Sequence, residues 1–292
     1  MSEYAYWIVD VFTAERFGGN QLAVIPQAEG LTGEQMQAIA REFNYSETTF
    51  VLPPEDPTHT ASFRIFTPAR ELPFAGHPTV GTAWVLGQER QLALPADLAL
   101  EAGVGLLRVR LEAYQATFQV ARQPEFGELD VTRTELADLL GLVPADLGPA
   151  EPVSSSCGLA FALVELKGLE SIARARLTRS LSDPIFEKWP VLKDLYMYSF
   201  ETVDPGVDLH TRMFAPGAGV AEDPATGSAA SALAAWLAHQ QAREGEFAWT
   251  IEQGLEMGRP SRISTRVVKS GGKQDVFVSG QVVPFSQGRL RI

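Results

Sequence analysis

Apolar and polar residues alternate along many short segments of this chain, and this is the pattern of strands packed on one face. Glycine and proline bound most of these segments. In the first half we expect strands at 6–12, 22–25, 48–52, 61–66, 106–111 and 116–120. In the second half we expect strands at 159–164, 195–200, 265–268, 275–278 and 280–283, the last three joined as hairpins.

Two segments carry the start signal of an amphipathic helix. Thr32 is followed three residues later by Gln35, and Thr132 is followed by Glu135, so each pair fits a capping box. Behind them, apolar residues recur with helical spacing on one face: Met36, Ile39, Ala40 and Phe43 in the first, and Leu136, Leu139 and Leu140 in the second. We therefore predict one surface helix in each half.

Two further helices are predicted to be buried. The segment after Pro78 is apolar nearly all round, and the segment 228–237, after Pro224, is rich in small residues and poor in charge. A helix that is apolar on every face belongs in a core. We expect Pro78 and Pro224 at the first helical position, where a missing N–H costs nothing. Each half then holds mostly antiparallel strands, a surface helix and a buried helix.

The buried helices begin in related sequences. The pattern Arg-x-Phe-x-Pro at Arg64 recurs at Arg212, and Pro-x-x-Gly-[Thr/Ser]-Ala at Pro78 recurs at Pro224, about half the chain length later. This indicates a duplicated domain. We place the boundary near residues 115–122, which gives an N-terminal half 1–118, a C-terminal half 119–280, and a closing strand 281–292 that could return to the N-terminal half.

Composition narrows the partners. Lys and Arg total 24 against 36 Asp and Glu, a net charge of −12, and no basic run occurs, so nucleic acid and anionic membranes are poor partners. No apolar run approaches the roughly 18 residues of a membrane span, and the N-terminus lacks signal-peptide features. We expect a cytoplasmic protein. The single cysteine, Cys157, excludes an internal disulfide, and without a metal or nucleotide motif we expect neither metal nor cofactor.

The residue before each shared proline could handle protons. It is His77 in one copy and Asp223 in the other. Asp223 fits equally well as a helix cap. His77 is not a favoured cap, and Gly76 beside it indicates close approach of the backbone to another group. Two related loops, each with such a group, indicate a site between the halves.

The starts of the two buried helices suit an anionic ligand. Helix N-termini present N–H groups and the positive end of the dipole, which favour a carboxylate. The donors there would be Gly76, Gly227 and Ser228. One interpretation of Glu47 is a solvated carboxylate at the end of a strand. The other is the main catalytic base, because the comparable segment of the second half has no acidic residue and a site with one main base would be asymmetric in this way. Asn20, in a Gly-Gly-Asn turn, could be a turn residue only.

Four motifs together resemble the PhzF-like phenazine-biosynthesis family. They are Asp10-Val11-Phe12-Thr13 with Phe17-Gly18-Gly19-Asn20-Gln21-Leu22-Ala23-Val24, then Ser46-Glu47-Thr48-Thr49-Phe50-Val51, then Phe74-Ala75-Gly76-His77-Pro78-Thr79, then Glu222-Asp223-Pro224-Ala225-Thr226-Gly227-Ser228-Ala229. The similarity runs from residue 9 nearly to the C-terminus. The resemblance implies an α+β fold of the diaminopimelate-epimerase type, with two pseudo-symmetric domains, each of antiparallel strands around a central helix, and a site in the cleft between them.

The resemblance also implies an activity. The family's characterised reaction is the cofactor-free isomerisation of trans-2,3-dihydro-3-hydroxyanthranilate by proton transfer, and its members are commonly homodimers. Carried over by motif, Glu47 resembles the catalytic acid/base, and His77 and Asp223 resemble supporting acid/base or substrate-binding groups. Gly76, Gly227 and Ser228 resemble the donors to a substrate carboxylate, and Asn20 resembles a further substrate contact.

Two other classes of function stay open on the sequence. One is a lyase or an epimerase acting on another small acid, and the other is a non-catalytic protein that binds a small molecule in the same cleft. Racemisation by two facing thiols is not among them, because Cys157 is the only thiol and lies outside the motif loops.

Overall fold

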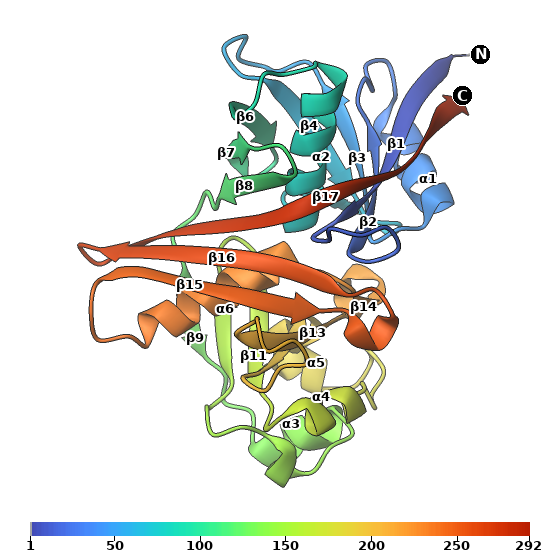
Figure 1. Ribbon diagram of the computed structural model, residues 1–292. Coiled ribbons are helices and arrows are strands. Elements are labelled where there is room, and N and C mark those ends of the chain that lie inside the picture. Colours follow the sequence, from blue (N-terminus) through green and yellow to red (C-terminus); the bar gives the residue numbers. More distant parts are fainter. Residues whose placement is uncertain (1) are drawn as a thin grey trace. The chain divides into compact units, whose positions relative to one another are not determined.

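The computed structural model (Figure 1) describes residues 2–292 and divides into two compact units. Unit 1 holds the residues up to Ala121 together with Phe277–Ile292, and unit 2 holds Arg122–Val276. No helix in residues 2–292 is long and apolar enough to cross a membrane.

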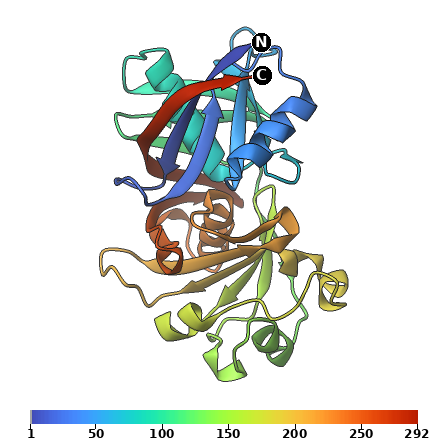
Figure 2. The same cartoon turned by 90° about the vertical axis from the view of Figure 1, so that its right-hand side faces the viewer.

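Unit 1 is a ring of strands around one helix. In chain order its elements are β1 (Glu3–Val11), β2 (Asn20–Ile25), α1 (Gly33–Phe43), β3 (Glu47–Leu52), β4 (Ala61–Phe66), β5 (Glu71–Leu72), α2 (Gly76–Glu89), β6 (Ala96–Ala102), β7 (Gly105–Leu111), β8 (Gln115–Gln119) and β17 (Lys273–Arg291), which starts in unit 2. Strand β17 pairs with both β8 and β1, so it closes the order β1-β2-β3-β4-β6-β7-β8. The two ends of the chain therefore lie side by side (Figure 2), and Glu3 pairs with Arg291.

Helix α2 fills the ring, and its residues from Gly76 to Gly87 are buried. It contacts β1, β2, β3, β7 and β8, whereas α1 lies on the outside against β3 and β4. Gly81 sits at a close approach between helix and sheet, because an added Cβ there would lie 2.5 Å from Leu22 Cδ2 and 2.8 Å from Val11 Cγ2. The predicted all-round apolar helix is thus the core of unit 1.

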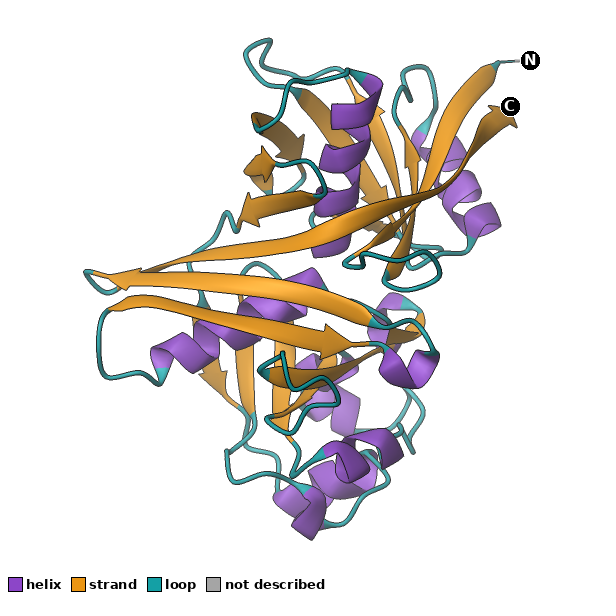
Figure 3. Cartoon of the chain, viewed as in Figure 1, coloured by secondary structure: helices purple, strands orange, loops and turns teal. Residues whose placement is uncertain are grey.

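Unit 2 holds the remaining elements. They are β9 (Glu125–Glu128), α3 (Arg133–Leu139), η1 (Pro144–Asp146), β10 (Val153–Ser156), β11 (Ala160–Glu165), α4 (Leu169–Arg174), α5 (Ile185–Lys188), η2 (Pro190–Lys193), β12 (Leu195–Ser199), β13 (Leu209–Ala215), η3 (Pro216–Ala218), β14 (Val220–Asp223), α6 (Gly227–His239), β15 (Gly245–Gln253), η4 (Leu255–Met257) and β16 (Ser261–Ser270). Helix α6 packs on β10, β11, β15 and β16. Unit 2 also contains the short helices α3, α4 and α5, which Figure 3 draws in purple with the other helices. They contribute Leu139, Ile172 and Phe186 to one apolar cluster.

The two units repeat one order of strand pairing. In unit 1, β2 runs parallel to β3, β3 antiparallel to β4, β4 parallel to β6, and β6 antiparallel to β7. In unit 2 the same succession joins β11, β12, β13, β15 and β16. Two parallel pairs in each unit add to the expected antiparallel ones, because the chain crosses over through helical segments between those strands.

Both predicted capping boxes are present. The Thr32 hydroxyl accepts from the Gln35 N–H, and Thr132 with Glu135 does the same at α3. Three details of the sequence prediction are wrong. The expected hairpin at 275–283 is one continuous strand, β17. Helix α2 begins at Gly76, so Pro78 is its third residue, and α6 begins at Gly227, three residues after Pro224. Prolines are tolerated throughout a first turn, because no N–H there has an intrahelical partner.

We expect Gly81→Ala to lower the free energy of unfolding by about 1–3 kcal/mol, because the new methyl group overfills the contact between α2 and the sheet. Urea unfolding followed by circular dichroism measures the change. Gly127→Ala is the matched control, since its Cβ would meet only Ser154 Cβ at 3.7 Å. Equal stability of the Gly81 variant and wild type would contradict the close packing of α2.

Candidate active site

Unit 1 brings Asn20, Glu47 and His77 together. Asn20 is the first residue of β2, Glu47 is the first residue of β3, and His77 is the second residue of α2. The parallel strands β2 and β3 start at the same edge of the sheet, with Leu22 opposite Glu47. His77 Nδ1 lies 3.2 Å from Asn20 Nδ2, and His77 Nε2 lies 3.4 Å from Glu47 Oε2. The two nitrogens of one imidazole therefore link the two strand starts.

His77 is neutral at neutral pH. Only 3% of its side chain is exposed, and this burial lowers the pKa of His77 from its ordinary 6.5 to about 3, against the opposing effect of a hydrogen bond to the Gln21 backbone. Its contact with Glu47 is consequently that of a neutral imidazole and a carboxyl group. At 3.4 Å the contact between His77 Nε2 and Glu47 Oε2 is longer than a well-formed hydrogen bond.

Unit 2 brings Asp223, Gly227 and Ser228 together at the start of α6. Asp223 ends β14, and Gly227 and Ser228 are the first two residues of the helix. The Thr226 hydroxyl donates to Asp223 Oδ2 at 2.5 Å. The alternative that Asp223 caps the helix is wrong, because the N-cap residue is Thr226. Asp223 instead presents a carboxylate, 8% exposed, just ahead of the helix.

Neither helix start is capped by a side chain. Ala75 precedes α2 and Thr226 precedes α6, neither makes a side-chain cap bond, and neither first turn contains an acidic residue. The positive end of each helix dipole is therefore not neutralised by the helix's own residues. Gly76, Gly227 and Ser228 occupy the first turns, where the sequence predicted donors.

The repeated Arg-x-Phe-x-Pro pattern builds the same clamp in both units. Arg64 donates to both oxygens of Glu71, at 2.7 Å each, and Arg212 donates to both oxygens of Glu222 at 2.8 and 2.9 Å. Each guanidinium also lies over the phenylalanine two residues on, at 5.0 and 4.9 Å. Glu222 directly precedes Asp223, so this clamp fixes the strand that carries the carboxylate.

Sequence reasoning found that repeat but missed its role. The signal was available, because an acid follows each repeated arginine within the loop that leads to the buried helix. Bidentate arginine–carboxylate pairs are directional as well as strong.

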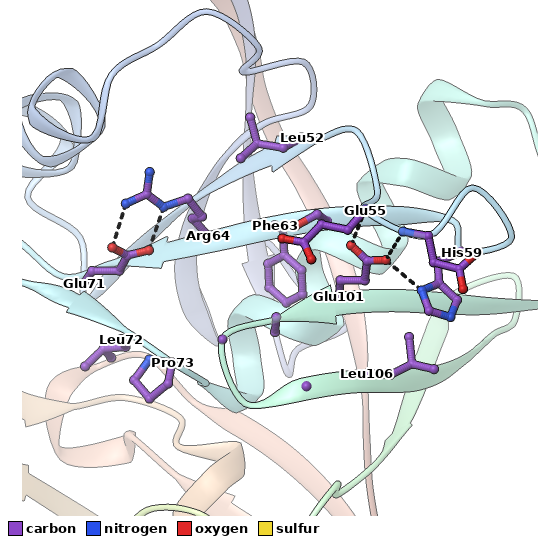
Figure 4. Close-up of a pocket in the computed structure, with 15 residues that line it drawn as sticks. Leu52, Glu55, His59, Phe63, Arg64, Glu71, Leu72, Pro73, Glu101 and Leu106 are labelled. Atoms are coloured by element: carbon purple, nitrogen blue, oxygen red, sulfur yellow. Dashed lines mark hydrogen bonds and ion pairs between the residues drawn. The ribbon is translucent and has the colours of Figure 1, made fainter.

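A cavity of about 800 Å³ opens elsewhere in unit 1, between β4–β5 and β6–β7. Figure 4 shows its charged side chains facing one another: His59 Nδ1 lies 2.7 Å from Glu101 Oε1, and Arg64 faces Glu71. None of the predicted catalytic or substrate-binding residues lines this cavity. Its half-buried charged groups are already paired with each other.

Two observations bear on other chemistries. Among residues 2–292, no group of three or more His, Cys, Asp or Glu side chains is placed to hold a metal ion. Cys157 is buried, and burial raises the pKa of its thiol to about 12. Such a thiol is a poor nucleophile at neutral pH.

The sequence profile of the PhzC-PhzF family, phenazine biosynthesis-like proteins, matches residues 9–288. The chain belongs to this family. It is an isomerase of the PhzF type. An uncharacterized isomerase of Mesorhizobium japonicum is 40% identical over 98% of both chains. The trans-2,3-dihydro-3-hydroxyanthranilate isomerase of Pseudomonas aeruginosa is 38% identical over 98% of this chain and 99% of its own.

Solved structures agree with the family assignment. The Bacillus anthracis phenazine biosynthesis protein of the PhzF family superposes with a TM-score of 0.92 and 28% identity over 100% of both chains. A hydroxyproline epimerase from Agrobacterium vitis shares the fold, with a TM-score of 0.65 at 13% identity over 99% of this chain and 92% of its own. The predicted resemblance to the PhzF family is confirmed.

The neutral state of His77 predicts a pH dependence of stability. Its pKa is lower in the folded chain than in the unfolded chain, so below pH 6.5 the unfolded state binds a proton that the folded state does not. We expect this residue to cost about 2 kcal/mol of unfolding free energy between pH 6.5 and pH 4.5. His77→Gln should lack that loss in urea unfolding at the two pH values. Gln88→Ala, an exposed change on α2 that removes no titrating group, should keep the wild-type pH dependence. An unchanged pH dependence in His77→Gln would refute the neutral state.

Proposed function

We propose that this isomerase moves a proton between two carbon atoms of a small carboxylated substrate, with Glu47 as the acid/base. The contact between Glu47 and a buried, neutral His77 carries the proposal. A cationic imidazole 3.4 Å away would favour the ionised carboxylate and weaken it as a base, and a neutral imidazole does not. With 13% of its side chain exposed, Glu47 is largely but not wholly removed from solvent.

The reaction is a balanced proton shift. The Glu47 carboxylate takes a proton from one carbon, and the electron pair of the broken C–H bond stays on the substrate. The resulting carboxylic acid, whose proton exchanges with solvent, then donates a proton to another carbon. The substrate's composition is unchanged. General acid–base help of this kind contributes about 10²–10⁴-fold.

The other predicted residues support binding and orientation. The uncapped starts of α2 and α6, with Gly76, Gly227 and Ser228, suit a substrate carboxylate. His77 and Asp223 act as supporting acid/base or substrate-binding groups, and Asn20 makes a further substrate contact. Groups fixed in this way lower the barrier by orienting the reacting carbons.

Two relatives of known activity support a proposal for the substrate class. The Pseudomonas aeruginosa and Pseudomonas chlororaphis relatives, each 38% identical, are trans-2,3-dihydro-3-hydroxyanthranilate isomerases. We propose this compound, or a small acid of similar chemistry, as substrate. Other relatives in the same range of identity are uncharacterized isomerases, so the first substrate screen should include further small carboxylic acids.

We expect Glu47→Gln to lower kcat by about 10²–10⁴-fold while ligand affinity stays within about threefold, because the amide keeps the shape but cannot accept the proton. Steady-state kinetics on trans-2,3-dihydro-3-hydroxyanthranilate and a thermal-shift titration measure the two quantities.

Glu42→Gln, an exposed change on α1 of the same unit, is the matched control and should retain wild-type turnover. Turnover of the Glu47 variant within threefold of wild type would sink the role of Glu47. Elimination or inversion products from an active wild-type enzyme would favour the lyase or epimerase alternative.

A further inference from the structure

The end of strand β15 and the turn after it hold the loop that carries Asp223. Gln253, the last residue of β15, is fully buried, and its amide reaches the loop with both of its ends. Nε2 donates to the Asp223 backbone oxygen at 2.7 Å and to Thr226 Oγ1 at 3.0 Å. Oε1 accepts from the Thr226 N–H at 3.2 Å. One side chain thus ties down both ends of the segment 223–226.

These bonds fix the direction of the Thr226 hydroxyl. An amide N–H group can only donate, so the hydroxyl oxygen must accept from Gln253 Nε2. The hydroxyl's single proton is then left for Asp223 Oδ2, at 2.5 Å. A hydroxyl–carboxylate bond of this length belongs to the strong, charge-assisted class. The amide therefore acts on the carboxylate through Thr226.

The backbone of the loop rests on the same turn. Gly254 has φ = 78°, and an added Cβ would lie 2.5 Å from both the Pro224 and the Arg259 backbone oxygens, so only glycine fits there. Ser261 Oγ donates to the Pro224 backbone oxygen at 2.9 Å. We call Gln253, Gly254 and Ser261 the cradle.

Buried polar contacts anchor the cradle in turn. Tyr196, fully buried on β12, has its hydroxyl 3.1 Å from Gln253 Oε1 and 3.1 Å from Thr211 Oγ1. His210 on β13 lies between two carboxylates, with Nδ1 2.8 Å from Glu252 and Nε2 2.9 Å from Glu256. The turn is therefore joined on both sides to the central strands of unit 2.

We propose that Gln253, acting through Thr226, is a positioning residue that sets the direction of the Asp223 carboxylate for the isomerase reaction. The inference rests on the proposed role of Asp223. A carboxylate whose direction matters in the transition state needs a support fixed by its own hydrogen bonds.

The first test removes only the hydroxyl of the relay. We expect Thr226→Val to lower kcat by about tenfold or more with KM within about threefold, because a small misplacement of a reacting group costs far more in turnover than in binding. Thr226→Ser restores the hydroxyl and should return kcat to within about threefold of wild type. Thr265→Val, which deletes a buried hydroxyl bonded to the Trp249 oxygen elsewhere in unit 2, should leave both constants unchanged.

The second test asks whether Thr226 acts through Asp223. In an Asp223→Ala background, adding Thr226→Val should change the residual kcat by less than about twofold, since the partner is already gone. A further tenfold loss in the double variant would overturn the proposal, because Thr226 would then act on its own. Wild-type kcat in Thr226→Val would overturn it as well.

The third test does not depend on turnover. In Gln253→Met, we expect amide hydrogen exchange at Thr226, measured by NMR, to accelerate about tenfold or more, because its acceptor Oε1 is lost. Amides of β12 should exchange as in wild type. If the wild-type enzyme converts no substrate, the proposed function fails, but this measurement still shows whether Gln253 holds the Thr226 backbone. Unchanged exchange at Thr226 would overturn the positioning role of Gln253.

Discussion

The burial of a neutral imidazole against Glu47 is the constraint on which the candidate site depends. His77 can lie there only because α2 begins inside a ring of strands, and the ring exists only because β17 pairs with both β8 and β1. Burial keeps the His77 imidazole uncharged, and in the proposed reaction this neutral ring lets Glu47 act as the base. At the start of α2, neither a side-chain cap nor an acidic residue of the first turn offsets the helix dipole. The pairing of β17 with β8 and β1 therefore affects the candidate site by burying the His77 side chain.

The two units share one order of strand pairing but place different residues near the start of the buried helix. Both repeat the same succession of parallel and antiparallel pairs, and both fix the approach to the buried helix with an arginine–glutamate clamp. They diverge at the shared proline. Helix α2 starts two residues before Pro78 and takes His77 into its first turn, whereas α6 starts three residues after Pro224 and leaves Asp223 on the preceding strand. The freed loop in unit 2 is held by the cradle, with Gln253 at its centre.

The sequence alone could predict the helices and strands whose signals lie in neighbouring residues. Alternation placed most strands, the pairs Thr32–Gln35 and Thr132–Glu135 placed two helix starts, and the all-round apolar segments marked the two core helices. Strand β13 was not predicted, because the consecutive polar residues His210, Thr211 and Arg212 interrupt any apolar alternation in its sequence. The role of Glu47 came from the family resemblance, since nothing in its local sequence distinguishes it. Gln253 escaped notice because its partners lie 30 and 57 residues away along the chain.

The most direct test of the account follows carbon-bound hydrogen. Wild-type protein and Glu47→Gln would be incubated with trans-2,3-dihydro-3-hydroxyanthranilate in D₂O and followed by proton NMR. The account predicts that wild type forms an isomer of unchanged composition, that deuterium from the solvent-exchanged Glu47 carboxyl group enters the newly protonated carbon, and that the variant does neither at a comparable rate. Isomer formation with Glu47 replaced, at an undiminished rate and with the same labelling, would contradict it.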